Sequence, residues 1–441
     1  MKQIQILRKL IYTIAACALP FSAAYSNGLD PAIESGSDRV EQQVIDWRHH
    51  FHRHPELSNR ETQTAKRIAK ELRKLGLDVE TGIAHNGVVA ILKGAKEGSV
   101  VALRADIDAL PVTEQTGLPY ASTVRTSYLG QEVGVMHACG HDAHIAILLG
   151  AAKVLTGMKE QIPGTIKFIF QPAEEGAPPG EQGGAKMMIE EGVLEGPAKP
   201  EAIFGLHVWP QEAGHIMYRA KGAMAASDQL EITVRGKQTH GSSPWAGVDP
   251  IIVSAQIMMA LQTIPSRHLD ITVAPSVITI GSIHGGVRGN IIPDEVKMVG
   301  TIRTFDREIR AELLRRLHNT TEAIAQSAGA TAEVVIRPYA PVTYNDPELT
   351  EQMLPSLYKA VGKEQVHPSP LVMGAEDFAY FQEKIPGLYL FLGVKEDGVP
   401  AAEAPSNHSP HFIVNDRALK NGVRTLSTLA LDYLKARSDN N

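Results

Sequence analysis

The amino-acid sequence predicts an α/β fold in which one sheet domain is interrupted by an inserted ferredoxin-like α+β satellite. Up to about residue 221, short apolar runs alternate with helical patterns, which is typical of a sheet covered by helices on both faces. Between about Gly222 and Pro338 the order becomes β-α-β-β-α-β, the order of a ferredoxin-like unit. The first pattern resumes at Ala340. We therefore expect a main domain over residues 39–221 and 339–441, with a satellite over residues 222–338.

Two helices open the main domain. Residues 39–54 form a helical pattern, and residues 61–75 form an amphipathic one that ends at Gly76. Further along, apolar runs predict strands and periodic segments predict helices. The predicted strands are residues 88–92, 100–103, 166–170 and 202–206, and the predicted helices are residues 143–158 and 184–191.

The satellite begins with an alternating strand at residues 229–234 and a helix at residues 250–261. Two strands follow, at residues 271–283 and 295–303, and then a helix at residues 307–328 and a strand at residues 332–336. The return to the main domain predicts a strand at residues 388–392 and a last helix at residues 416–435. An unpaired edge of the satellite sheet could pair with another copy of the chain.

The N-terminus carries the pattern of a secretory signal. Lys2, Arg8 and Lys9 precede an apolar run at residues 10–21, and small residues follow up to Ala24. This run is too short to span a bilayer, so we expect residues 1–24 to be removed and the protein to be periplasmic or secreted. Whether Cys17 is instead a lipoprotein site stays open.

Composition narrows the range of partners. Hydrophobic residues make up 43% of the chain and charged residues 21%, which is ordinary for a globular protein. The formal net charge is −6 and no run is rich in Lys and Arg, so nucleic acid is not an expected partner. No segment beyond the leader reaches about eighteen apolar residues, so no membrane contact is expected after its removal.

The segment Met136-His-Ala-Cys-Gly-His-Asp-Ala-His144 combines sulfur, nitrogen and oxygen donors for metal ions. Cys139 would be the only cysteine after leader removal, and a lone thiol in an oxidising compartment needs to be buried or occupied. His141 lies with Cys139 in the turn before the predicted helix at residue 143. The other candidate donors, Glu174, Glu175, His207 and His408, lie just after predicted strands or in the loop before the last helix, where open α/β sheets bind ligands.

This donor set predicts a metal-dependent hydrolase, because one Glu can hold a metal while its neighbour moves protons. Three other interpretations stay open. Cys139 could be the nucleophile of a thiol hydrolase with His141, although residues two apart rarely reach each other. His50 and His54 could bind a metal on one helix face. The chain could also be an exported binding protein, for which Glu174 would have no use.

Six motifs in this order resemble the aminoacylase family of metallohydrolases, and within it the branch of hippurate hydrolase and the indoleacetyl-amino-acid hydrolases. The motifs lie at residues 47–58, 103–111, 137–144, 170–176, 205–209 and 408–412, and the resemblance runs from about Val40 to the C-terminus. It implies a zinc-aminopeptidase-like catalytic domain whose inserted satellite serves as a lid or for dimerisation.

The resemblance also implies roles for individual residues. The ligands of two divalent ions (Zn, Mn, Co or Ni) would be Cys139, His141, Glu175, His207 and His408. Glu174 would be the general base, and His240 would stabilise the tetrahedral oxyanion, sometimes across a dimer. Asn290 and Arg303 would bind the substrate carboxylate, and Gly374 would lie in the substrate-side loop.

Asp106 stands where peptidase relatives carry a ligand histidine, a departure that is typical of the amidohydrolase branch. Asp108 would orient a ligand. The sequence therefore predicts an amidohydrolase that cleaves N-acyl-L-amino acids, hippurate-like or N-acetyl conjugates among them, with a hydroxide held by the cations and Glu174 as base. The alternative is a metallo-carboxypeptidase or dipeptidase. A homodimer through the satellite is the expected protein partner, while the acyl group, the amino acid and the native metal stay open.

Overall fold

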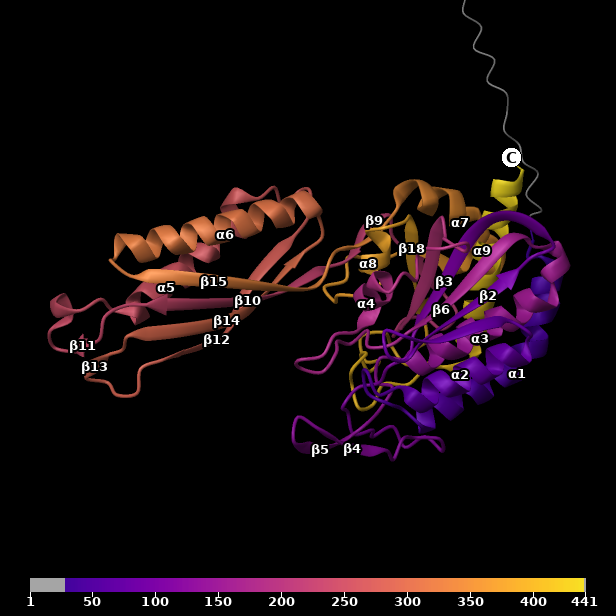
Figure 1. Ribbon diagram of the computed structural model, residues 1–441, viewed down its shortest axis with the longest axis horizontal. Helices are drawn as coiled ribbons and strands as arrows, with labels where there is room; N and C mark the ends of the chain where they lie inside the picture. Colours follow the sequence, from indigo (N-terminus) through magenta and orange to yellow (C-terminus); the bar gives the residue numbers. More distant parts are fainter. Residues whose placement is uncertain (1–27, 440–441) are drawn as a thin grey trace, which may run out of the picture.

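The computed structural model describes residues 28–439, which form two lobes (Figure 1). The larger lobe is built on an eight-stranded sheet, and the smaller lobe on a four-stranded sheet. The predicted signal peptide, residues 1–24, and Cys17 lie outside the described residues. No helix within residues 28–439 has the length and apolar character needed to cross a bilayer.

Four parallel strands form the centre of the large sheet: β6 (Pro163–Gln171), β3 (Lys96–Asp106), β7 (Ala202–Trp209) and β18 (Gly387–Gly393). The antiparallel strands β1 (Asp78–Ile83) and β2 (Gly87–Lys93) extend one side, and β8 (Ile216–Tyr218) and β17 (Val366–Pro368) extend the other. Because β7 and β18 are buried on both faces, their sequences read as continuous apolar runs. Parallel pairing brings the carboxyl ends of the central strands to one edge.

Helices cover both faces of this sheet, as predicted. One face carries α1 (Pro31–Arg53), α2 (Thr62–Lys74), α3 (His141–Gly157), α7 (Pro347–Val361) and α9 (Leu419–Ser438) around a single apolar core. The other face carries the short helices α4 (Gly184–Glu190) and α8 (Ala379–Gln382), which pack Met188 and Phe381 against the strands. The α/β fold class is confirmed.

The smaller lobe has the predicted element order. Its strands are β10 (Ala226–Arg235), β12 (Ser276–Gly285), β14 (Glu295–Thr304) and β15 (Thr331–Ala340), all antiparallel in the order β12-β14-β10-β15. The helices α5 (Pro250–Leu261) and α6 (Arg307–Ser327) pack their apolar side chains on one face of this sheet. Figure 1 places this lobe to one side of the large sheet. The domain boundaries at residues 222 and 338 stay predictions.

Several element ends differ from the predictions for local reasons. The first helix begins at Pro31 rather than residue 39, because the Asp30 side chain accepts the Ala32 N–H and proline suits the first helical position. The strand predicted from residue 271 begins only at Ser276, since Asp270 accepts hydrogen bonds from Thr272 and closes a turn. The last helix follows a short 3-10 turn at Asp416–Ala418.

The sequence patterns missed the helices α7 and α8 and the outer strands β1, β8 and β17 of the large sheet. They also missed three two-stranded pairings: β4 (Arg125–Tyr128) with β5 (Gln131–Gly134), β9 (Lys221–Met224) with β16 (Thr343–Asn345), and β11 (Thr239–His240) with β13 (Ile291–Ile292).

Candidate metal centre and active site

The predicted ligands lie at the carboxyl edge of the central strands. The N-cap of α3, Gly140, has φ 89°, so the chain turns sharply between Cys139 and His141. His207 lies near the end of β7, and Glu175 follows β6 after a loop in which Ala173 has φ 53°. His408 comes from the loop before α9. Strand ends and one helix start thus bring five donors from distant parts of the chain together.

The donor atoms lie close enough to share cations. Cys139 Sγ is 3.3 Å from His207 Nε2 and 3.2 Å from His408 Nε2. Glu175 Oε1 is 3.1 Å from His408 Nε2 and 4.0 Å from His141 Nε2. Two groups, Cys139–His141–His207 and Cys139–Glu175–His408, each keep their donor atoms within 4.8 Å of one another. Because Cys139 belongs to both groups, its sulfur lies between the two candidate positions.

The chemistry of these donors fits metal ions. His141 Nε2 and Glu175 Oε1 are buried polar atoms without a hydrogen-bond partner. Such atoms cost free energy unless something satisfies them, and a cation between them would do so. Burial, followed by the Glu175 and Glu174 carboxylates, raises the pKa of Cys139 well above its usual value. A neighbouring cation would favour the thiolate instead.

Asp108 orients two of the candidate ligands. Its backbone oxygen lies 2.9 Å from His141 Nδ1, and its Oδ2 accepts the Glu175 N–H at 3.0 Å and the Ser58 hydroxyl at 2.7 Å. Burial would raise the pKa of Asp108, but the hydrogen bonds from His141, Ser58 and Glu175 hold it below its usual value. This is the orienting contact that the resemblance implies.

Glu174 lies beside the cluster and is 5% exposed. Its Oε2 is 3.9 Å from His141 Nε2, and its Oε1 is 3.4 Å from the Asp377 backbone N–H that donates to it. Burial, followed by Glu376 and Glu175, raises the pKa of Glu174 well above its usual value. Nearby cations would favour its ionised form. A carboxyl next to the ligands, with an oxygen to spare, can take or give a proton at this site.

Arg104 lies in the motif at residues 103–111, and the structure places it at the centre of the acidic groups. It is fully buried on β3 and lies 2.7 Å from Asp106, 3.0 Å from Glu376 and 3.0 Å from Asp377. Asp106 also lies 2.5 Å from His144 Nδ1, and the other ring nitrogen of His144 accepts the Val208 N–H. An arginine directly after a buried apolar run was the signal that could have indicated this charge balance.

The family model described as Peptidase family M20/M25/M40 matches residues 102–432. The chain belongs to this family. Thermostable carboxypeptidase 1 of Saccharolobus solfataricus is 41% identical over 397 residues, which cover 89% of this chain and 96% of the relative. N-acetyl-L-cysteine deacetylase of Bacillus subtilis is 39% identical over 381 residues, covering 86% of this chain and 85% of the relative.

A solved structure of the Bacillus subtilis YXEP protein, described as a dinuclear metal binding peptidase from the M20 family, matches with TM-score 0.75 and 34% identity. The match covers 90% of this chain and 99% of that chain. The resemblance drawn from the motifs is confirmed, and this M20-family chain is a metal-dependent amidohydrolase. The roles of its individual site residues stay predictions.

The satellite residues are not all brought to this M20-family site. His240 in β11 and Asn290 just before β13 lie at the end of the small lobe that is farther from the large sheet (Figure 1). Arg303 pairs with Ser227 at the opposite end of β14, nearer the large sheet, and donates to Thr301 Oγ1. Within one chain, His240 and Asn290 are therefore not beside the ligand cluster.

Two cavities lie near the M20-family motifs. The first, of about 230 Å³, is lined by the cluster residues Cys139, Glu174, Glu175, His207 and His408, and also by Gly374, Trp209 and Met224. The predicted substrate-side glycine therefore opens onto the ligands.

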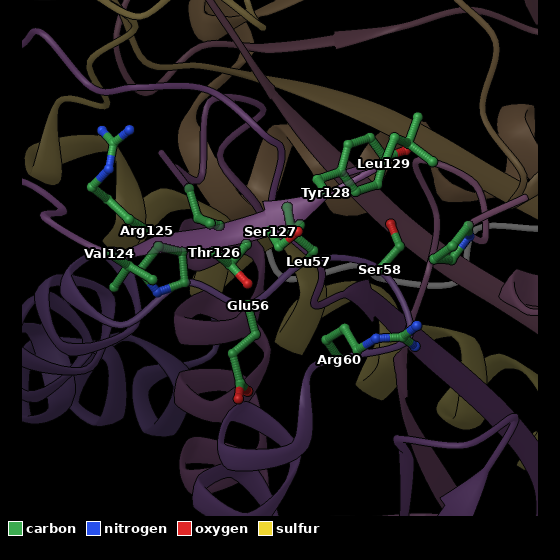
Figure 2. Close-up of a pocket in the computed structure, with 13 residues that line it drawn as sticks. Glu56, Leu57, Ser58, Arg60, Val124, Arg125, Thr126, Ser127, Tyr128 and Leu129 are labelled. Atoms are coloured by element: carbon green, nitrogen blue, oxygen red, sulfur yellow. The ribbon is translucent and has the colours of Figure 1, made fainter. Parts of the chain in front are cut away.

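Figure 2 shows a second cavity of about 350 Å³ between β4 and residues 55–60. The one carboxyl group that lines this cavity is that of Glu56, and it points away from the cavity toward α2. It accepts hydrogen bonds from the backbone N–H groups of Gln63 and Thr64. Of these two cavities, only the first is lined by the predicted metal ligands.

Proposed function

We propose that this enzyme hydrolyses the amide bond of N-acyl-L-amino acids and releases a carboxylic acid and a free amino acid. The observation that carries the proposal is Glu174, a buried carboxyl beside the donors and within the same cavity. The 39% identity to an enzyme named N-acetyl-L-cysteine deacetylase supports this substrate class.

We propose that two divalent ions, Zn, Mn, Co or Ni, would be held by Cys139, His141, Glu175, His207 and His408. When bound, such ions polarise an amide carbonyl and make water a nucleophile near neutral pH. Sulfur, imidazole and carboxylate together suit these metals.

Glu174 carries out the proton transfers of the proposed reaction. Its carboxylate takes a proton from the attacking water and delivers it to the amide nitrogen as the amine leaves. The Asp377 N–H donates to Oε1, while Arg104 partly offsets the negative charge of Glu376 and Asp377 beside the base. The buried position keeps bulk water from competing for the proton.

Trp209 and Met224 offer an apolar wall to the acyl group. A side chain at position 374 would narrow the space in front of it, because a Cβ there would lie 3.4 Å from Met224 Cε. We assign the substrate carboxylate to Arg303 and Asn290, and the oxyanion to His240. Since His240 and Asn290 lie far from the cluster within one chain, we propose that a second copy supplies them.

The surface of the small lobe supports such a dimer. The edge strand β12 pairs only with β14, so its other edge is free among the described residues. Apolar side chains lie exposed on and near α5: Ile252 is 57% exposed, Met259 76% and Trp245 82%. An apolar helix face beside an open strand edge favours association.

A carboxypeptidase activity is the second candidate. It is favoured by the 41% identity to an enzyme named thermostable carboxypeptidase 1. The two candidates differ in the group on the acyl side of the scissile bond, which is a simple acyl group in one and an aminoacyl group in the other.

A substrate panel separates them. Acetyl-, benzoyl- and indoleacetyl-amino acids and unblocked dipeptides are assayed with defined Zn, Mn, Co or Ni. We expect the N-acyl compounds to be cleaved with at least tenfold higher kcat/KM than the dipeptides, and the reverse order would establish the peptidase. We expect EDTA to abolish turnover, whereas full activity after metal removal would favour Cys139 as a nucleophile and contradict the proposal.

We also propose that the protein is exported, because residues 1–24 have the layout of a secretory signal. Expression in a Gram-negative host with fractionation and intact-mass measurement tests this. The expected product is periplasmic and begins after Ala24. A full-length cytoplasmic product would contradict the proposal.

A further inference from the structure

Tyr339 connects the small lobe to the segment that carries the proposed base. It lies at the end of β15, where the chain returns from the small lobe to the large one. Its hydroxyl donates a hydrogen bond of 2.6 Å to the backbone oxygen of Glu174. Among the described residues, Tyr339 is the only one whose side chain donates a hydrogen bond to the Glu174 backbone oxygen.

Tyr339 is held both at its ring and at its backbone. Gly176, with φ 99°, brings its backbone beneath the ring, and a Cβ there would lie 3.4 Å from Tyr339 Cε2. On the other side, the Tyr380 hydroxyl donates to the Tyr339 backbone oxygen at 3.0 Å. Tyr380 lies in α8, which packs on the large sheet. Tyr339 thus lies between a fixed helix and the loop after β6.

That loop depends on side chains for its position, because no strand ladder or helix holds residues 173–176. Glu61 accepts the Ala173 N–H at 2.9 Å, and Asp108 accepts the Glu175 N–H at 3.0 Å. Both of these anchors come from the large lobe. The third, the Tyr339 hydroxyl, comes from the strand that leads out of the small lobe.

We infer that Tyr339 is a positioning residue for Glu174: its hydroxyl, on a residue that Tyr380 ties to the large lobe, fixes the backbone of the proposed base. This inference rests on the proposed function, in which Glu174 is the general base.

Tyr339→Phe tests the inference, because it removes the hydroxyl and keeps the ring over Gly176. We expect kcat to fall about fivefold to tenfold, the rate equivalent of one lost neutral hydrogen bond, while KM and bound metal stay unchanged. The matched control is Tyr433→Phe in α9, away from the site. The Tyr433 hydroxyl accepts a hydrogen bond of 3.3 Å from Arg437 Nε. We expect wild-type kcat from the control. Wild-type kcat in Tyr339→Phe, or a loss confined to KM, would overturn the inference.

A double variant separates positioning from a general structural role. If Tyr339 acts through the base, then adding Tyr339→Phe to Glu174→Gln causes no further loss in the residual rate. The same five- to tenfold loss in both backgrounds would show that Tyr339 acts on something else. Full turnover in Glu174→Gln alone would instead refute the base, and with it the proposed function.

Discussion

Glu174 and Glu175 are neighbours whose surroundings assign them different chemistry. Glu175 Oε1 faces His408 at 3.1 Å and His141 at 4.0 Å, and it lacks a hydrogen-bond partner. Glu174 is tied at its backbone by Tyr339 and at its side chain by the Asp377 N–H. One carboxyl is therefore presented to cations, and the other is held beside them with an oxygen available for a proton.

This difference predicts opposite outcomes for two isosteric variants. Glu174→Gln should lower kcat by about 10²- to 10⁴-fold, the usual contribution of a general base, with bound metal unchanged. Glu175→Gln should lose metal, because it replaces an anionic ligand by a neutral one. Steady-state kinetics together with metal analysis of the purified proteins measures both. Loss of metal from Glu174→Gln, or retention of two ions by Glu175→Gln, would exchange the assigned roles.

At the scale of residues, the sequence indicated the candidate ligands and the orienting Asp108, but it did not indicate the contacts of Arg104 and Tyr339. A lone Cys139 and several His and Glu after strands are visible in the sequence because each is an unusual residue at an unusual place. Arg104 contacts Asp377, which lies 273 residues further along the chain, and only tertiary structure pairs them. Tyr339 and Glu174 are 165 residues apart, and no local pattern distinguishes Tyr339 from other strand tyrosines.

At the scale of elements, the start of α3 places two ligands through a single glycine. Gly140 has φ 89°, and a Cβ there would lie 2.3 Å from Val208 Cγ2. Gly140→Ala should therefore lower the free energy of unfolding by about 2–4 kcal/mol, because alanine disfavours the left-handed backbone and its Cβ would clash with Val208. It should also lower metal affinity, since Cys139 and His141 flank the turn. Chemical denaturation and metal titration measure these effects.

Gly157→Ala at the other end of α3 is the matched control. Nothing lies within 4 Å of a Cβ at Gly157, so this variant should be neutral or stabilised by about 0.4–1 kcal/mol. Equal stability of the two variants would mean that the turn at Gly140 relaxes and that its conformation does not matter.

The packing of α1 on α3 predicts a pH dependence of stability. His52 is 2% exposed and lies 2.9 Å from Asp142 Oδ2 and 3.1 Å from Glu114 Oε1. Burial alone would lower the pKa of His52, but Asp142 and the hydrogen bonds to Asp142 and Glu114 raise it to about 9. The unfolded value is about 6.5. The stability that His52 contributes is therefore complete below about pH 6.5 and lost as the pH rises through about 9.

Unfolding free energies of wild type and His52→Gln between pH 6 and about 9.5 test this expectation. The difference between the two proteins should shrink as the pH rises. His54→Gln, at an exposed position directly after the same helix, is the matched control for the replacement of a histidine by glutamine. A gap between wild type and His52→Gln that stays constant or widens with pH would contradict the sign of the shift.

Long periodic elements could be predicted, because their apolar spacing repeats often enough to be read. The bounds of α5 agree with the prediction at both ends, and the β-α-β-β-α-β order is observed. The two-residue strands β11 and β13 are too short to carry a pattern. The β4–β5 hairpin consists largely of exposed polar residues, so no alternation reveals it. The early start of α1 was signalled by Asp30-Pro31, which the pattern of apolar residues did not include.

At the scale of the whole molecule, the sequence predicts that a satellite exists and leaves its placement open. The order of elements follows from local periodicity, whereas the direction in which the small lobe extends depends on how β10 and β15 leave the large one. In the structure, β11 and β13 lie at the far end of that lobe (Figure 1). This placement separates His240 and Asn290 from the ligands of their own chain. In the proposed dimer, each chain would supply these two residues to the site of the other chain.

A mixture of two inactive variants tests this exchange of residues. In a dimer with exchanged satellite residues, a His240→Ala chain keeps its base and receives His240 from a Glu174→Gln partner, so one of the two sites is intact. Random pairing of equal amounts should restore about a quarter of wild-type activity, because half the dimers are mixed and each mixed dimer has one complete site of its two. Co-expression with two affinity tags isolates the mixed dimer by double purification, and this dimer should have about half of wild-type activity. If His240 serves its own chain, the mixture stays inactive. If His240→Ala alone is fully active, the residue has no role in turnover. Met259→Glu in both chains should prevent recovery by placing a charge on the exposed apolar face of α5, where Met259 is 76% exposed.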